Sequence, residues 1–176
     1  MAPRAHTFRR DEQRYSGRFF QVVLYRPEIP QNTGNVARTC AATHTPLHLV
    51  EPLGFQLSDR HLKRAGLDYW PHVQLEVHPG WGAVCERLAG RRLVFFSTRG
   101  ELSYHHFPFR CGDCLVFGSE TAGLPQELLT THRDHVVYLP IDRSCVRSLN
   151  LSTAVGIALF EAIRQFALSD NPITAL

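Results

Sequence analysis

The chain has 176 residues, of which 44% are hydrophobic and 20% are charged, and its formal net charge is +3. This length suits one well-buried domain, and the composition is ordinary for a globular protein. The charge surplus is too small to indicate nucleic-acid binding by itself, and no apolar run approaches the ~20 residues of a membrane span. The first residues also lack the apolar segment of a secretory signal, so we expect a cytoplasmic protein with no membrane partner.

The sequence predicts an arm, one domain and a tail. Residues 1–18 carry five arginines without periodicity, which predicts a flexible basic N-terminal arm. A single domain is expected over residues 19–168, followed by a C-terminal tail over residues 169–176. Cys111 and Cys114 have the spacing of a metal-ligand pair, but no second pair or His-x-x-x-His motif accompanies them. We therefore expect free thiols and no metal.

The first part of the domain alternates predicted strands and helices. The β-rich segment Phe19 to Tyr25 predicts the first strand, and Pro27 and Pro30 predict an irregular loop after it. A polar turn then leads into a helix, which Asn or Thr can cap and whose free N–H groups could face an anion. The elements expected next are strands over 47–50 and 73–77 and helices over 58–64 and 80–88.

The second part continues the alternation, with strands over 92–96, 114–117 and 136–139 and helices over 125–129 and 150–168. His105 and His106 are expected to form a solvated pair in a loop. Strands alternating with helices predict an α/β fold with a mostly parallel sheet flanked by helices. The last helix is apolar on two sides, so it needs a second surface, and another copy of the chain is the simplest supplier.

Two of the predicted strands end in polar turns close together in sequence. The run Cys114 to Phe117 is continuously apolar, as in a strand buried on both faces, and Gly118 lets the backbone turn. The strand ending at Leu139 repeats this pattern. Ligands of parallel sheets bind beyond the carboxyl ends of strands, so these turns predict one pocket built largely from main chain. With Phe96 and Leu149 as apolar walls, such a pocket could hold a flat purine.

Two other enzyme classes fit the sequence poorly. Gly34 lies between a predicted strand and a helix, and Glu51 ends the next strand, as in dinucleotide-binding enzymes, but the loop has one glycine instead of three. Ser119 lies in a Gly-Ser-Glu turn and not in the Gly-x-Ser-x-Gly elbow of a hydrolase. We disfavour both interpretations.

Three segments resemble the signature motifs of the SPOUT class of RNA methyltransferases. They are Asn32-x-Gly34-Asn35-x-x-Arg38, the Phe-Gly-Ser-Glu-Thr-Ala-Gly-Leu-Pro run over 117–125, and the Arg-Ser-Leu-Asn-Leu-Ser run over 147–152. More narrowly, residues 25–35 and 64–69 resemble the family of tRNA 2'-O-methyltransferases that modify the wobble nucleotide. The resemblance covers roughly residues 20–165 in order, and the motifs are specific only in combination.

The resemblance implies a C-terminal trefoil knot, S-adenosylmethionine as cofactor and an obligate homodimer. It implies methyl transfer to the ribose 2'-hydroxyl of the wobble nucleotide, cytidine or modified uridine, in the anticodon stem-loop of tRNA. By motif position, the cofactor-binding residues are Phe96, Thr98, Gly118, Glu120, Leu139, Ile141, Ser148, Leu149 and Asn150.

The resemblance also implies that Arg38 acts on the hydroxyl, with Asn32 as the second catalytic residue. Arginine is effectively always protonated. We therefore hypothesise that Arg38 orients an RNA phosphate and stabilises developing charge, while Asn32 fixes the turn.

Two alternatives remain open: a related methyltransferase for another tRNA position or for ribosomal RNA, and a knotted RNA-binding module without catalysis. Plainer roles also remain for individual residues. Arg38 would be a surface arginine of a helix, Glu120 a turn acid that accepts backbone N–H bonds, and Asn150 a helix cap. The sequence departs from the family pattern at Ser119, where proline is common, and at Phe160, where tyrosine is common.

Overall fold

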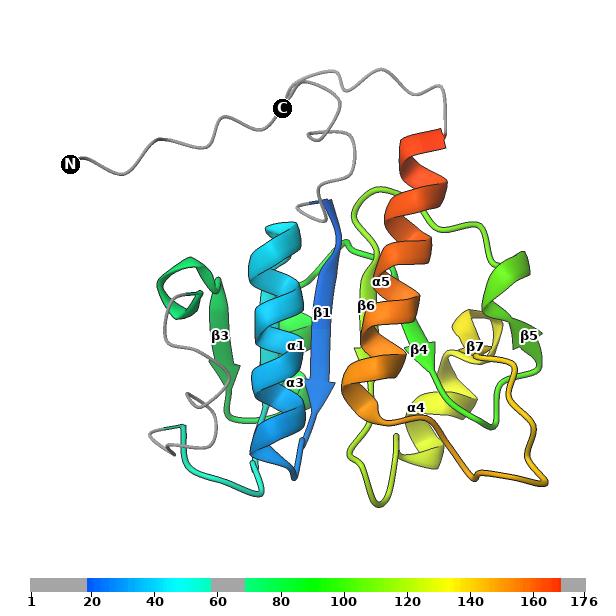
Figure 1. Ribbon diagram of the computed structural model, residues 1–176, viewed down its shortest axis with the longest axis horizontal. Coiled ribbons are helices and arrows are strands. Elements are labelled where there is room, and N and C mark those ends of the chain that lie inside the picture. The colour runs from blue at the N-terminus through cyan, green and yellow to red at the C-terminus, as the bar shows by residue number, and fades with distance from the viewer. Residues whose placement is uncertain (1–18, 58–68, 169–176) are drawn as a thin grey trace.

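The computed structural model describes residues 19–57 and 69–168 (Figure 1). The predicted arm, the tail and the helix expected over 58–64 lie outside the described residues. The strands are β1 Gln21–Tyr25, β2 Leu47–Val50, β3 Leu75–His78, β4 Leu93–Phe96, β5 Leu102–Ser103, β6 Cys114–Phe117 and β7 Val136–Tyr138. The α-helices are α1 Pro30–Thr43, α3 Trp81–Arg87, α4 Gln126–Thr131 and α5 Leu151–Leu168. Short 3-10 helices are η3 Trp70–His72, η4 Tyr104–His106 and η5 Arg133–His135.

The described strands form one seven-stranded sheet in the order β3-β2-β1-β6-β4-β7-β5. Every pairing between these described strands is parallel, which confirms the predicted α/β class with a parallel sheet. β1 is buried throughout because it pairs with β2 on one side and with β6 on the other. A continuous apolar run suits such a central strand.

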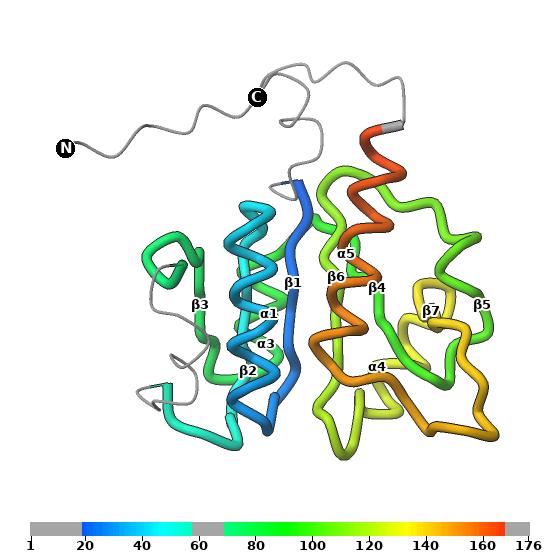
Figure 2. Tube along the Cα trace, in the orientation of Figure 1, coloured from blue at the N-terminus to red at the C-terminus, as the bar shows by residue number. Residues whose placement is uncertain are grey.

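Helices cover both faces of the sheet and bury two hydrophobic clusters. α1 and α5 lie side by side over one face, where Leu24 and Leu159 belong to the same cluster (Figures 1 and 2). α3 and α4 cover the other face, where Val84 and Leu129 pack around Val116. Because alternate side chains of a strand point to opposite faces, each strand of the middle of the sheet contributes to both clusters.

Several boundaries differ from the sequence-based expectation. α1 begins at Pro30, where a loop was expected. Proline is tolerated at the first helical position because the N–H that it lacks would have no partner within the helix. No side chain caps α1 locally, since its N-cap is Ile29. His105 and His106 lie in η4 and not in an irregular loop. The two-residue strand β5 was not predicted, since so short an element leaves no periodic pattern. None of the described helices is long and apolar enough to cross a membrane.

A buried polar chain links the first three strands. His48 Nε2 lies 2.5 Å from Gln21 Oε1, and His48 Nδ1 lies 2.9 Å from His78 Nε2. Glu76 completes a group whose ligand atoms lie within 4.8 Å of one another, but Arg87 donates to both of its oxygens at 2.7 Å. Burial lowers the pKa of His48 to about 4, so the imidazole is neutral at ordinary pH. Hydrogen bonds among the side chains satisfy this cluster, and we interpret it as a link between strands.

Candidate functional site: a cavity at the carboxyl edge of the sheet

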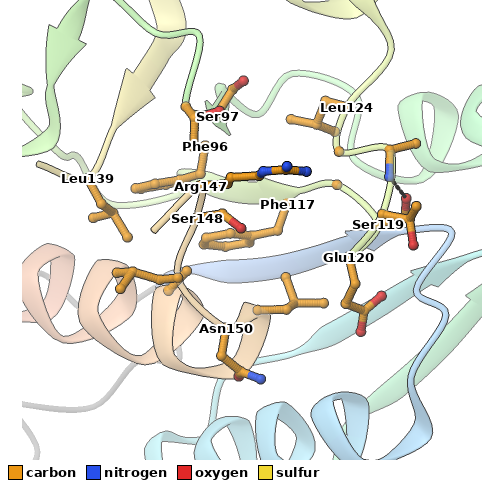
Figure 3. Close-up of a pocket in the computed structure, with 18 of the residues that line it drawn as sticks. Phe96, Ser97, Phe117, Ser119, Glu120, Leu124, Leu139, Arg147, Ser148 and Asn150 are labelled. Carbon is orange, nitrogen blue, oxygen red and sulfur yellow. Dashed lines mark hydrogen bonds between the residues drawn. The ribbon is translucent and has the colours of Figure 1, made fainter. Parts of the chain in front are cut away.

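A cavity of about 580 Å³ opens where β4, β6 and β7 end. It is lined by the ends of these strands, the loop after β6, and the segment that leads into α5 (Figure 3). The nine residues predicted to bind the cofactor all line it: Phe96, Thr98, Gly118, Glu120, Leu139, Ile141, Ser148, Leu149 and Asn150. Asn32 lines it as well. The predicted pocket is therefore present, and its volume is in the range of small-molecule sites.

The floor of the cavity is aromatic. The rings of Phe96 and Phe117 stack with centroids 4.7 Å apart and planes inclined by 13°. The two residues end the paired strands β4 and β6 and are opposite each other in register, which fixes the stack. Both rings are almost fully buried within the chain. The stack therefore gives the cavity an apolar base.

The loop after β6 folds so tightly that only glycine fits at its start. A Cβ on Gly118 would lie 2.1 Å from the carbonyl carbon of Gly123 and 2.3 Å from the nitrogen of Leu124. Gly123 itself has a φ of +69° and donates its N–H to the Ser119 carbonyl at 3.0 Å. The chain can therefore follow this path only because residue 118 has no side chain.

Side chains from the three motifs meet beside this loop. Glu120 accepts hydrogen bonds from the Glu28 N–H at 2.8 Å, the Ile29 N–H at 3.3 Å and the Asn32 side-chain amide at 2.9 Å. The Asn150 amide donates to Asn32 Oδ1 at 2.9 Å. Glu120 thus places a carboxylate beside the two residues that precede α1. The plainer role proposed for Glu120, that of accepting backbone N–H groups, is correct and is compatible with its place in the cavity wall.

Asn150 also has the plain role that the sequence suggested. Its side-chain oxygen accepts the N–H of Ser152 at 2.9 Å and the hydroxyl of the same residue at 2.7 Å, so it caps α5. The cap and the bond to Asn32 use different atoms of one amide. One residue therefore sets both the start of α5 and the position of the first motif.

Arg38 lies outside the lining of the cavity. It is an exposed residue of α1, and its guanidinium carbon lies 4.9 Å from the centre of the Tyr69 ring. Tyr69 in turn donates its hydroxyl to the Gly34 carbonyl at 3.0 Å. A planar cation held on an aromatic face has a defined orientation although it is exposed. The described chain thus brings ten of the eleven predicted site residues to the cavity and leaves Arg38 apart.

Several lining residues were not in the predicted set. Figure 3 shows the Arg147 side chain extending across the cavity toward the loop that carries Ser119. Arg99 and Thr121 also line the cavity. Arg147 and Thr121 lie inside two of the three signature motifs, so their place within a motif could have predicted them as lining residues. Arg99 follows β4 by three residues, and position after a strand was its only signal.

Comparison with known proteins decides the family. Residues 20–160 match the model of the SpoU rRNA Methylase family. The chain belongs to the SpoU methylase family. This membership confirms the predicted resemblance to RNA methyltransferases, since the match extends over most of the chain.

Individual SpoU relatives cover nearly the same span. A tRNA (cytidine(34)-2'-O)-methyltransferase of Methylovorus glucosotrophus is 50% identical over 147 residues, with 83% of this chain and 95% of the relative covered. A solved structure, "Structural insights into the 2-OH methylation of C/U34 on tRNA", is 54% identical, with a TM-score of 0.79 and 83% and 95% coverage. The SpoU methyltransferase AviRb of Streptomyces viridochromogenes, solved with AdoMet, is 28% identical, with a TM-score of 0.71 and 82% and 57% coverage.

Proposed function

We propose that this protein transfers the methyl group of S-adenosylmethionine to the ribose 2'-hydroxyl of the wobble nucleotide, cytidine or uridine 34, of tRNA. The observation that carries the proposal is the cavity in which all three motifs meet. The proposal is supported by the tRNA (cytidine(34)-2'-O)-methyltransferase described above, which is 50% identical to this chain over 147 residues, or 95% of its own length.

The residues of the cavity fit the cofactor. The stacked Phe96 and Phe117 give the cavity an apolar base, and the Gly118 turn, which has no room for a Cβ, lies in its lining. We assign the adenosine to this part of the cavity, which Leu139 and Ile141 also line. When bound, S-adenosylmethionine supplies a methyl group on a sulfonium, whose departure as a neutral thioether makes the methyl carbon electrophilic. The transfer step therefore needs no metal ion from the protein.

The remaining task of the protein is to place the ribose hydroxyl in line with that methyl group. We assign to Arg38 the binding of a neighbouring RNA phosphate and the stabilisation of charge that develops as the hydroxyl proton passes to solvent. A planar cation with no lone pair to accept a proton suits this role and not that of a base. Asn32, held by Glu120 and Asn150, keeps the start of α1 at the edge of the cavity.

We further propose that the active form is a homodimer. Phe160 and Ile157 on α5 are 56% and 38% exposed, and Ile29 beside the cavity is 42% exposed. A second copy would cover these apolar side chains. It would also supply the Arg38 that a single chain keeps away from its own cavity. Phe160→Glu is expected to give monomers in sedimentation experiments and to reduce methyl transfer, whereas a dimer that persists would contradict this interface.

We infer that the C-terminal part is threaded as a trefoil knot and that the enzyme acts in the cytoplasm, where tRNA is processed. The support for the knot is the path of the chain. β7 pairs between β4 and β5, and α5 then returns to pack against α1 and β6. The segment between β7 and α5 must therefore pass close to the loop after β6, and both line the cavity.

The test is methylation of tRNA that lacks wobble modification, with isotopically labelled S-adenosylmethionine and mass spectrometry of the digested nucleosides and fragments. A labelled 2'-O-methyl group at position 34, absent with Arg38→Ala, is the expected result. A methyl group at another position would favour a related methyltransferase, and tRNA binding without transfer would favour a binding module. Either result would reject the proposed function.

A further inference from the structure

Two loops that are far apart in sequence hold each other through reciprocal hydrogen bonds. The Glu120 carboxylate accepts the Glu28 N–H at 2.8 Å, although the two residues are 92 positions apart in the sequence. In return, Glu28 Oε2 accepts the Thr121 N–H at 3.2 Å and the Thr121 hydroxyl at 2.5 Å. Each carboxylate therefore binds the segment that carries the other, and the loop after β1 is fastened to the loop after β6.

The Glu28 side of this contact is held firmly from behind. Gly54 donates its N–H to the Pro27 carbonyl at 2.9 Å. Its α-carbon approaches so closely that an added Cβ would lie 2.7 Å from the Cα and the carbonyl oxygen of Glu28. The backbone of Glu28 thus lies between the Gly54 turn and the Glu120 carboxylate, so its side chain extends from a fixed base.

The Thr121 side of the contact belongs to the cavity wall. Glu120 and Thr121 line the cavity, whereas Glu28 does not. Glu120 also accepts the side-chain amide of Asn32 at 2.9 Å. A shift of the Thr121 turn would therefore move both the wall of the cavity and the partner of Asn32.

We propose that Glu28 is a positioning residue of the methyl-transfer site. It fixes the loop over 118–123 against the start of α1, and in this way holds the cofactor-facing wall and Asn32 in one arrangement. This inference rests on the proposed function for the reaction that it serves, but its first consequence, cofactor affinity, is measured without RNA. The hydrogen bonds involve a charged acceptor but are exposed to water, so their loss is expected to change affinity about five- to tenfold and not to abolish it.

The experiment compares Glu28→Ala, Glu28→Gln and Thr121→Val with wild-type protein and with Glu86→Ala. Glu86 is an exposed glutamate of α3, on the other face of the sheet, and serves as the matched control. Calorimetry gives the Kd of S-adenosylhomocysteine, single-turnover assays give the transfer rate, steady-state assays give the KM for tRNA, and thermal scans give Tm.

Glu28→Ala and Thr121→Val are each expected to raise the Kd about five- to tenfold and to slow transfer, with the KM for tRNA unchanged. The double variant is expected to be no worse than either single variant, since both remove the same contact. Glu28→Gln keeps an oxygen that can accept the Thr121 hydroxyl and should stay within about twofold of wild type. Glu86→Ala should match wild type.

The proposal is overturned if Glu28→Ala and Thr121→Val leave the Kd unchanged, or if their effects multiply in the double variant. It is also overturned if Glu28→Gln is as defective as Glu28→Ala. Should Glu28→Ala fail to fold, Thr121→Val removes only the hydroxyl and decides the question. If the wild-type protein does not methylate position 34, only the proposed function is rejected. The role of Glu28 is tested separately, by comparing the Kd values of the variants and the wild-type protein for S-adenosylhomocysteine.

Discussion

The side-chain amide of Asn150 donates a hydrogen bond to the side-chain oxygen of Asn32 at 2.9 Å, across 118 residues of sequence. The oxygen of the same Asn150 amide caps α5, and the amide of Asn32 continues the chain of bonds to Glu120. A change at Asn150 can therefore affect the stability of a helix and the geometry of the cavity, and the two effects can be separated.

Asn150→Asp separates them. Aspartate caps a helix about as well as asparagine, so Tm should change little. The variant has no amide to donate, and it places a carboxylate beside the oxygen of Asn32, so methyl transfer should fall by at least about tenfold. Asn150→Ala is the comparison. It should lose both the helix cap and the hydrogen bond to Asn32, and its free energy of unfolding should be lower by about 1 kcal/mol. Full activity of Asn150→Asp would show that the bond to Asn32 has no role in the reaction.

Arg38→Lys keeps the positive charge of Arg38 and removes its planar fork. We expect turnover about 100-fold lower, with the Kd for S-adenosylhomocysteine unchanged, since Arg38 lies outside the lining of the cavity. Near-normal turnover at normal cofactor affinity would refute the assigned role. The measurements are steady-state kinetics with tRNA and calorimetry without it.

Tyr69 tests whether the orientation of Arg38 matters. Tyr69→Phe keeps the ring under the guanidinium and loses only the hydroxyl bond to the Gly34 carbonyl, so activity should stay close to wild type. Tyr69→Leu removes the ring, and transfer should fall about five- to tenfold, as expected for one exposed cation–π contact. Equal activity of the two variants would show that the ring does not orient Arg38.

Gly118→Ala places a methyl group where the backbone of Gly123 passes. The clash at 2.1 Å cannot be relieved by a side-chain rotation, so the loop must move. We expect a loss of about 1–3 kcal/mol of unfolding free energy and a loss of S-adenosylhomocysteine binding. Gly82→Ala is the matched control, because a Cβ at that helical position meets nothing within 4 Å. It should be neutral or stabilising by up to about 1 kcal/mol in denaturant titrations.

The stability of the fold should fall in mild acid because of His48. Burial lowers the pKa of this imidazole from 6.5 to about 4, with Glu76 opposing the shift and His78, Arg87 and Arg91 adding to it. The unfolded chain takes up the proton near pH 6.5 and the folded chain only near pH 4, so the free energy of unfolding decreases as pH falls between them. The decrease from this group can approach about 3 kcal/mol, and above pH 6.5 the group has no such effect.

His48→Gln should flatten this part of the stability profile, measured by urea unfolding at several pH values. His72→Gln, at an exposed position, should leave the profile as in the wild type. Parallel profiles for wild type and His48→Gln would show that His48 does not set the acid sensitivity.

The sequence predicted most elements of the fold from short-range patterns. β6 was expected because Cys114 to Phe117 is a continuous apolar run followed by glycine, and the structure places it at the centre of the sheet. α1 was expected to start later because Pro30 was assigned to an irregular loop after the first strand, although the first turn of a helix tolerates proline. The contact between the buried residues His48 and His78 could not be predicted from the sequence, since no local pattern relates two histidines that lie in different strands.

The sequence by itself determined most of the strands and helices, and which turns could face a ligand. These properties depend on side-chain periodicity and on backbone freedom within a few residues. Only the tertiary structure decided that β6 lies between β1 and β4, that Glu28 contacts Thr121, and that Arg38 lies apart from the cavity. Those relationships depend on how distant strands pair and how the connecting chain runs between them, and no local pattern encodes that path.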